Sequence, residues 1–279
     1  MSEYRSEVWR VNVRKQTLTR QPVPESWQRL GGRGLVARAL LDEIDARCDP
    51  LGRENKLIFA PGLLVGHMLS STDRISIGAK SPLTRGIKEA NAGGRTGLHM
   101  TYLGIHALIL EDQPEEASQW ILHISANGAR WIRSDELVGL GCYEAARILV
   151  QQYGDKVAIA LIGPAGEHQL TAASINNIDK DRVPSRIAAR GGLGAVMGTK
   201  GLKAIVFDNS GGQRPPVAEP TLFRAAQKEY TKAVLEHPQS IAYRDYGTAG
   251  MAHMSDGFGG IPTRNFSAGH FEQVEDISG

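Results

Sequence analysis

Two stretches rich in glycine and arginine, about a hundred residues apart, constrain this chain more than any other feature. The first spans residues 74–97 and contains Asn91-Ala92-Gly93-Gly94-Arg95-Thr96-Gly97. Adjacent glycines let the backbone approach a ligand closely, and consecutive N–H groups beside an arginine form a site for a phosphate-like anion. The same letters also fit an ordinary glycine-rich turn between two elements. The recurrence of the pattern in the second stretch favours the anion site.

The second stretch runs Arg186-Ile187-Ala188-Ala189-Arg190-Gly191-Gly192-Leu193-Gly194-Ala195-Val196-Met197-Gly198. Two arginines four residues apart precede glycines at which we expect a helix to begin. A third segment, Gly31-Gly32-Arg33-Gly34, also opens a predicted helix, either as a plain helix start or as a second anion-binding N-terminus. We expect no buried strand directly before either segment, so neither meets the dinucleotide-binding fingerprint, and a Rossmann-type nucleotide enzyme is disfavoured.

Hydrophobic patterning predicts an α+β fold with more than one sheet up to residue 208. Strands are expected where apolar residues alternate or run together, and helices where they recur every three or four residues. The expected strands are 8–13, 17–23, 56–60, a half-buried strand at 74–78, 106–110, 120–124, 129–132, 157–162 and 203–207, and the expected helices are 35–44, 97–102 and 143–152. We find no obvious internal repeat in the sequence.

The C-terminal part of the chain has a different composition. Residues 1–208 are expected to form one N-terminal domain, and residues 209–219 a linker, because they contain SGGQRPPV. Residues 220–279 then read as the beginning of a helical domain. The last residues are polar and lack a capped ending, so we expect the sequence to be part of a longer chain.

Composition excludes several classes of protein. The net charge of +2 argues neither for nor against a nucleic-acid partner, but no basic run is interleaved with aromatic residues, so we expect no nucleic-acid partner. The two cysteines, Cys48 and Cys142, form no CxxC pair, so no all-cysteine iron–sulfur cluster or zinc site is expected, and low cysteine usage fits the cytoplasm. The N-terminus is polar and no run of about 18 apolar residues occurs, so we expect neither a signal peptide nor a membrane helix. His67, His99 and His106 lack metal-ligand spacing.

Taken together, several short segments resemble the N-terminal part of the aldehyde:ferredoxin oxidoreductase family, the tungsten-pterin enzymes. The resemblance runs from Trp9 to Phe266. Each segment alone is weak, but their order and spacing together are specific. The segments are Gly31-Gly32-Arg33-Gly34-Leu35, Asp73-Arg74, Lys80-Ser81-Pro82-Leu83-Thr84, Ala90-Asn91-Ala92-Gly93-Gly94, Ile162-Gly163-Pro164-Ala165-Gly166-Glu167, Arg190 to Gly198, Tyr246-Gly247-Thr248-Ala249 and Pro262-Thr263-Arg264-Asn265-Phe266.

The resemblance implies a two-sheet domain that carries a bis-pterin cofactor. In this family two pyranopterins hold one tungsten, or molybdenum in some relatives, through four dithiolene sulfurs, and a magnesium ion bridges their phosphates. Asn91 would hold the magnesium through its side chain, and Ile187 through its backbone carbonyl. The cofactor contacts that the resemblance implies are Arg74, Asn91, Gly93, Arg186, Ile187, Ala189 and Arg190.

Two positions depart from the family pattern. Ala189 and Arg85 stand where many relatives have glycine. An alanine held at a positive φ would cost about 1 kcal/mol, which would weaken the implied contact at Ala189.

The family oxidises aldehydes to carboxylic acids and passes the electrons through a 4Fe-4S cluster to ferredoxin or a partner subunit. Its cluster cysteines, in a C-x-x-C-x-x-x-C run, and its acid/base groups fall beyond the present sequence. We therefore expect no catalytic residue here, no turnover by this chain alone, and a homo-oligomer or larger complex. The alternative is a non-catalytic homologue, an assembly or binding module with the same fold, although such a module would not need the retained arginines.

Overall fold

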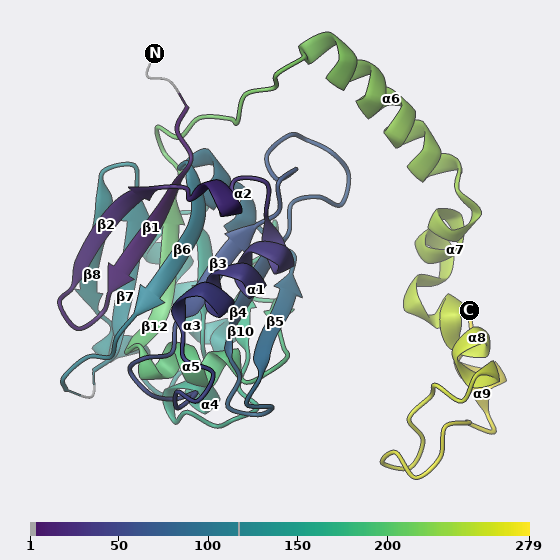
Figure 1. Cartoon of the computed structure of the whole chain (residues 1–279). Coiled ribbons are helices and arrows are strands. Elements are labelled where there is room, and N and C mark those ends of the chain that lie inside the picture. Colours follow the sequence, from purple (N-terminus) through teal and green to yellow (C-terminus); the bar gives the residue numbers. More distant parts are fainter. Residues whose placement is uncertain (1–3, 117) are drawn as a thin grey trace. The chain divides into compact units, whose positions relative to one another are not determined.

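The computed structural model describes residues 4–116 and 118–279, so the first residues of the polar N-terminus lie outside the described part. The chain divides into two compact units, Met1–Pro216 and Val217–Gly279. Each unit is described by itself below (Figure 1).

The first half of the larger unit forms a six-stranded sheet. Its elements are β1 (Glu7–Asn12), β2 (Thr17–Pro22), the 3-10 helix η1 (Glu25–Trp27), α1 (Gly32–Glu43), β3 (Leu57–Pro61), β4 (Ile75–Lys80), β5 (Ile87–Ala92), α2 (Thr96–Tyr102) and β6 (Ile105–Glu111). The strand order is β2-β1-β6-β3-β4-β5. Strands β1 and β6 pair in parallel, and the other pairs are antiparallel.

The second half forms another six-stranded sheet. Its elements are β7 (Trp120–Ser125), β8 (Gly128–Arg133), η2 (Asp135–Leu137), α3 (Cys142–Tyr153), β9 (Ala158–Leu161), α4 (Pro164–Glu167), β10 (Ile175–Asn177), β11 (Arg186–Ala188), α5 (Leu193–Thr199) and β12 (Leu202–Asp208). The strand order is β11-β10-β9-β12-β7-β8, with β7 and β12 parallel and the other pairs antiparallel. Two sheets combined with helices confirm the expected α+β class.

The two sheets face each other across the largest hydrophobic core, which contains residues from both. Helices α2 and α5 lie in this middle layer, while α1 and α3 cover the outer faces of the first and second sheet with smaller cores of their own (Figure 1). The expectation of a half-buried strand at 74–78 is wrong, because every residue of β4 is buried. Ile75 and Ile77 enter the middle core, and the opposite face lies under α1, where Gly78 leaves room for Val36.

The two halves repeat the same fold, although the sequence shows no obvious repeat. Each half runs through two strands, a 3-10 turn, an outer helix, three strands, an inner helix and a last strand, and the second half has the short helix α4 in addition, between β9 and β10. Replacing each element of the first sheet by its counterpart turns one strand order into the other. The repeat extends to close contacts. A β-carbon placed on Gly97, in α2, would lie 2.9 Å from the carbonyl oxygen of Arg74, and one on Gly194, in α5, would clash with the carbonyl oxygen of Ser174.

The repeat places the edge strands β5 and β11 side by side. Strand β11 lies at the start of the second glycine-rich stretch, just before its glycines, where we expected no strand. It is three residues long, pairs antiparallel with β10, and carries two exposed side chains, so hydrophobic patterning could not detect it. An exposed antiparallel edge strand still does not meet the dinucleotide fingerprint, which needs a buried parallel strand.

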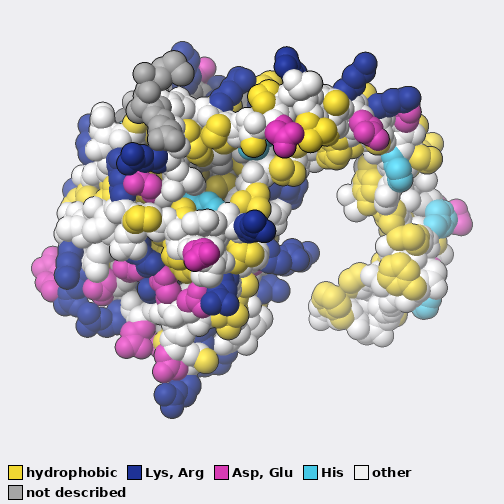
Figure 2. All heavy atoms as spheres, turned by 45° about the horizontal axis from the view of Figure 1, so that its top comes forward, with side chains coloured by type: hydrophobic (Ala, Val, Ile, Leu, Met, Phe, Trp, Pro, Cys, Tyr) yellow, Lys and Arg dark blue, Asp and Glu magenta, His cyan; other side chains and the backbone are white. Residues whose placement is uncertain are grey.

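The smaller unit is helical. It consists of α6 (Pro220–Glu236), α7 (Pro238–Tyr246), η3 (Gly247–Met251), α8 (Ala252–Gly257) and α9 (Val274–Ile277). None of its elements has a buried residue, and hydrophobic side chains lie open on its surface (Figure 2). Among the described residues, no helix has the length and apolar character needed to cross a membrane.

Candidate functional site

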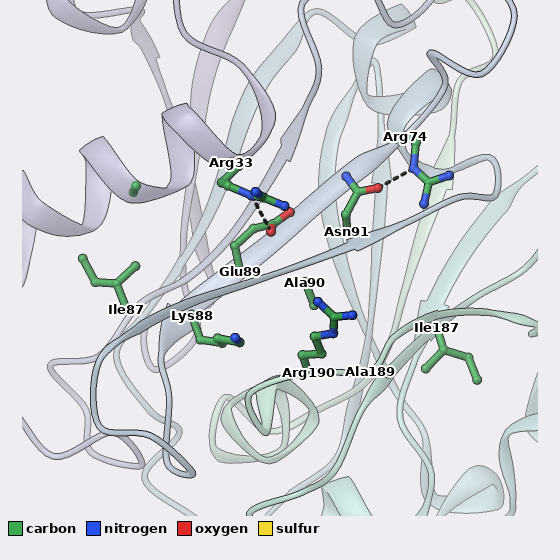
Figure 3. Close-up of a pocket in the computed structure, with 11 residues that line it drawn as sticks. Arg33, Arg74, Ile87, Lys88, Glu89, Ala90, Asn91, Ile187, Ala189 and Arg190 are labelled. Carbon is green, nitrogen blue, oxygen red and sulfur yellow. Dashed lines mark hydrogen bonds and ion pairs between the residues drawn. The ribbon is translucent and has the colours of Figure 1, made fainter. Parts of the chain in front are cut away.

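Two adjoining hollows lie where the edge strands β5 and β11 meet. The first has a volume of ≈ 750 Å³ and reaches towards α1, and the second has a volume of ≈ 710 Å³ and reaches towards the loops before β4 and β11. Both are lined by Arg74, Asn91 and Ile187, which therefore stand at the boundary between them. Figure 3 shows the first hollow, with Asn91 and Arg74 close together and Ile187 and Arg190 across from them.

The structure brings all seven of the implied site residues together. Beside the three boundary residues, Ala189 and Arg190 line the first hollow, and Gly93 and Arg186 line the second. Each hollow therefore receives one arginine from the second glycine-rich stretch. The guanidinium groups of Arg186 and Arg190 have no hydrogen-bond or ion-pair partner among the described residues, so both remain available to an anion.

Asn91 and Ile187 occupy equivalent positions in the two halves. Asn91 pairs with the second residue of β4, next to the Ile75–Ala92 pair. Ile187 pairs with the second residue of β10, next to the Ile175–Ala188 pair. The two magnesium ligands implied by the resemblance are thus related by the internal repeat, one on each edge strand.

The close-up adds three charged residues that the sequence did not single out as contacts: Arg33, Lys88 and Glu89 (Figure 3). Arg33 lies in the first turn of α1, in the segment considered as a second anion-binding helix start. Lys88 and Glu89 lie on β5, which is not among the strands expected from the sequence. The period-two alternation of buried and exposed residues in β5 was too weak to predict a strand. Its buried residues are the small Ala90 and Ala92, and the residues beside them are polar.

A hydrogen-bonded chain crosses the outer face of β4 and β5 at this site. The Nε of Arg33 donates to Oε2 of Glu89 at 3.1 Å, and the hydroxyl of Ser76 donates to Oε1 of the same carboxylate at 2.6 Å. Nδ2 of Asn91 donates to Ser76 Oγ at 3.3 Å, and the Nε of Arg74 donates to Oδ1 of Asn91. The chain links the start of α1 to the boundary between the hollows.

The loop after β5 needs only one of its two adjacent glycines for the fold. Gly94 has φ +95°, and a β-carbon there would lie 2.7 Å from the carbonyl oxygen of Ile178. Gly93 faces the second hollow, and a β-carbon there would meet only the Arg186 side chain, at an ordinary 3.6 Å. The two glycines therefore differ in role: Gly94 is required by the backbone conformation, whereas Gly93 leaves the wall of the second hollow open.

The two departures from the family pattern differ in their backbone. Ala189 is not among the described residues with positive φ, so the cost considered for it does not arise. Arg85 has φ +60°, the left-handed conformation that favours glycine. Its backbone N–H donates to the carbonyl of Ser81 at 2.8 Å, in the tight turn between β4 and β5.

Comparison with known proteins identifies the family of this chain. Residues 8–209 match the family described as aldehyde ferredoxin oxidoreductase, N-terminal domain, and residues 225–279 match the family described as domains 2 and 3 of the same enzymes. The chain belongs to the aldehyde ferredoxin oxidoreductase family. The expected resemblance is thereby confirmed.

Named members of the aldehyde ferredoxin oxidoreductase family match over most of the chain. The tungsten-containing aldehyde ferredoxin oxidoreductase of Pyrococcus horikoshii is 35% identical over 100% of this chain and 45% of its own length. The protein of the same name in Thermococcus kodakarensis is 36% identical over 90% of the chain and 40% of its own length. An aliphatic sulfonate oxidoreductase, WOR-like subunit, from Pyrococcus furiosus is 27% identical over 89% of the chain. The chain thus spans less than half the length of these relatives.

A solved structure shares the fold of this aldehyde ferredoxin oxidoreductase family member. It is the active site complex BamBC of benzoyl coenzyme A reductase in complex with 1,5-dienoyl-CoA. The TM-score is 0.76 at 28% identity, and the match covers 84% of this chain and 35% of the other. The two-sheet unit therefore occurs in an oxidoreductase complex as well as in the aldehyde enzymes.

Proposed function

We propose that this chain is the cofactor-binding part of an oxidoreductase that converts aldehydes to carboxylic acids at a tungsten- or molybdenum-bis-pyranopterin centre. The electrons would leave through a 4Fe-4S cluster to ferredoxin or to a partner subunit. Both the cluster ligands and the groups that handle protons at the metal would come from sequence outside this chain. The observation that supports the proposal is the pair of adjoining hollows at the junction of two repeated sheet edges.

The residues at this junction suit a cofactor with two similar anionic halves. The hollows differ little in volume, ≈ 750 Å³ and ≈ 710 Å³, and Arg190 lines one while Arg186 lines the other. Each guanidinium can bind one phosphate through two parallel hydrogen bonds. Among the described residues, no group of three or more His, Cys, Asp and Glu side chains could hold a metal ion. A metal held by the cofactor's own sulfurs needs no such group.

The chain's own residues would bind and orient this cofactor. Arg186 and Arg190 would neutralise the two phosphates, and Arg74 would face both from the boundary. A magnesium ion between the phosphates would take the Asn91 amide oxygen and the Ile187 backbone carbonyl as ligands, because magnesium prefers oxygen. When bound, the metal–pterin group would supply the two-electron oxidation. We also propose that the protein forms an oligomer or a larger complex, as related proteins that act in complexes do, and that it is located in the cytoplasm.

The test is elemental analysis of the full-length gene product, with pterin fluorescence after oxidative release. The protein should be purified without oxygen from a host supplied with tungstate and molybdate. We expect about one tungsten or molybdenum and two pterins per chain. A well-folded protein that contains neither metal nor pterin would contradict the proposal and favour the non-catalytic homologue.

Replacing both unpaired arginines tests the phosphate sites directly. Arg186→Ala combined with Arg190→Ala should lower cofactor retention by about a hundredfold or more, because each charge-assisted contact contributes about 1.5–3 kcal/mol. The fold should remain, since neither guanidinium is bonded within the described chain. The matched control is Arg133→Ala with Arg147→Ala, two exposed arginines whose ion pairs lie on the second sheet and α3. Full pterin and metal content in the Arg186/Arg190 variant would show that the phosphates bind elsewhere.

A further inference from the structure

We propose that Lys88 is a further phosphate-binding residue of the first hollow, where it acts together with Arg190. The inference rests on the proposed function, in which that hollow receives one of the cofactor's two phosphates. Lys88 is not among the seven contacts that the family resemblance implies. It lies in the first half of the repeat and Arg190 in the second, so this phosphate would be held from both halves.

Strand β5 directs Lys88 away from its acidic neighbour in the sequence. Successive side chains of a strand point to opposite faces, so Lys88 shares the face of Ala90, which enters the middle core, and Glu89 lies on the other face. The carboxylate of Glu89 already accepts hydrogen bonds from Arg33 and Ser76. The ammonium group of Lys88 has no hydrogen-bond or ion-pair partner among the described residues.

The stem of Lys88 packs over Gly191, the residue directly after Arg190. Gly191 has φ +81°, and a β-carbon there would clash with Cγ of Lys88 and lie 2.9 Å from its Cβ. The Gly191 carbonyl also accepts a hydrogen bond from the buried Ser81 hydroxyl at 2.7 Å, which fixes the glycine against the turn after β4. The missing side chain thus gives the lysine stem its path, and the ammonium end points along the hollow towards Arg190 (Figure 3).

Two unpaired cations in one hollow favour an anionic ligand. Lys88 and Arg190 both line the first hollow. Like charges repel each other, and the repulsion grows where the side chains are partly buried. A lysine that served only to cover the surface would extend its ammonium group into water, away from other cations. A phosphate monoester, with a charge of about −1.5 to −2 at neutral pH, matches the pair.

The second hollow has fewer unpaired cations. Of the basic side chains that line it, Lys180 pairs with Asp181 at 3.3 Å. Arg95 donates to the carbonyl of Asp155 at 3.0 Å. Apart from the arginine at the boundary, this leaves Arg186. The phosphate in the first hollow would therefore meet one more unpaired cation than the phosphate in the second.

The experiment replaces Lys88 in the full-length protein, purified with its cofactor. Lys88→Met keeps most of the stem that packs on Gly191 but removes the charge, and Lys88→Arg restores a positive charge. Pterin lost during dialysis at low and at high salt is measured by fluorescence after oxidation. We expect Lys88→Met to release pterin about tenfold faster than the unaltered protein at low salt, because one charge-assisted contact is lost. The difference should shrink at high salt, which screens that contact, and Lys88→Arg should resemble the unaltered protein.

The matched control is Lys156→Met, the same substitution at an exposed lysine that lines neither hollow. It changes the net charge equally and should release pterin at the unaltered rate.

A second measurement needs no substitution. An amine-reactive reagent should modify Lys88 in full-length protein from a host that makes no pterin, and most of this labelling should be lost in the pterin-loaded protein. Lys156 should react alike in both forms and serves as the internal reference.

The outcomes distinguish this inference from the proposed function. Unaltered release of pterin from Lys88→Met, or equal labelling of Lys88 in both forms, would overturn the role of Lys88 and leave the cofactor proposal standing. Faster release that persists unchanged at high salt would also overturn that role, because a packing defect is not screened. An unaltered protein without pterin would overturn both.

Discussion

His99, in α2, is buried in the middle layer with only one ring nitrogen satisfied. Its Nδ1 lies 2.9 Å from the carbonyl oxygen of Phe207 and must therefore donate, while Nε2 has no partner among the described residues. Protonation would place an unpaired N–H and a charge in an apolar surrounding. Burial accordingly lowers the pKa of His99 to about 4.

This pKa predicts a loss of stability in acid. Below about pH 6.5 the unfolded histidine binds a proton, whereas the folded one does so only below about 4, so stability falls as the pH falls through this window. The full loss is about 3 kcal/mol. His99→Asn keeps a donor for Phe207 and should flatten the dependence of the unfolding free energy on pH between 6.5 and 4. His168→Asn, the same substitution at an exposed histidine, is the control.

Arg85 predicts a gain in stability on substitution. Its φ of +60° is unfavourable for any residue with a β-carbon, and its side chain has no bonded partner among the described residues. Arg85→Gly should therefore raise the free energy of unfolding by about 0.5–1 kcal/mol, after the extra entropy of glycine in the unfolded chain is subtracted. Urea unfolding measures this change. A lower unfolding midpoint would show that the turn does not keep this conformation.

At the scale of elements, the sequence predicted the long and apolar ones correctly. Strands such as β3, β6 and β12 are runs of buried hydrophobic residues, and the one amphipathic face of α3 meets the second sheet. The missed strands β5 and β11 carry exposed or polar residues that line the hollows, and β10 is only three residues long with two buried asparagines. Burial of apolar residues gives strands their sequence pattern, so the edge strands at the candidate site were the hardest to predict.

The loop between β5 and α2 gives a prediction at the same scale. Gly94→Ala should destabilise the protein by about 2 kcal/mol or more, because a positive φ combines with a clash against the Ile178 carbonyl. Gly93→Ala should leave the unfolding midpoint within about 0.5 kcal/mol of the unaltered protein, yet reduce cofactor content by narrowing the second hollow. Thermal unfolding and pterin analysis on the pair test this. Equal effects of the two substitutions on stability would contradict the assigned roles.

At the scale of the larger unit, the structure is a pair of similar halves joined by the connection between β6 and β7. The sequence could not reveal the repeat, because corresponding positions such as Ser76 and Asn176 no longer carry similar residues. The two glycine- and arginine-rich stretches were recognisable from the sequence pattern, but the seven individual site residues were named only through family resemblance. These residues come from two edge strands and from the segments before β4, after β5 and after β11, and composition or periodicity would not bring them together.

The paired architecture predicts that the halves can be made as separate chains. Residues 1–116 and 117–279, expressed together with a tag on one chain, should purify as a complex, since the main core takes residues from both sheets. At micromolar concentration the complex should be about 4 kcal/mol less stable than the single chain. In the single chain each half meets the other at an effective concentration in the millimolar range, whereas the separate chains must associate from solution. Each half expressed alone should be poorly soluble, as it would expose the inner face of its sheet. Recovery of either half as a soluble folded monomer would contradict this.

The difference between Asn91 and Ile187 has a consequence for how a ligand can sit on this unit. Two identical halves would offer a two-headed ligand two interchangeable orientations of equal energy. Asn91 carries a polar amide where Ile187 carries an exposed apolar side chain, so the two halves are not equivalent to such a ligand. Under the proposed function the two heads of the cofactor would thereby be distinguished, and a reaction centre held between them would be bound in a single orientation.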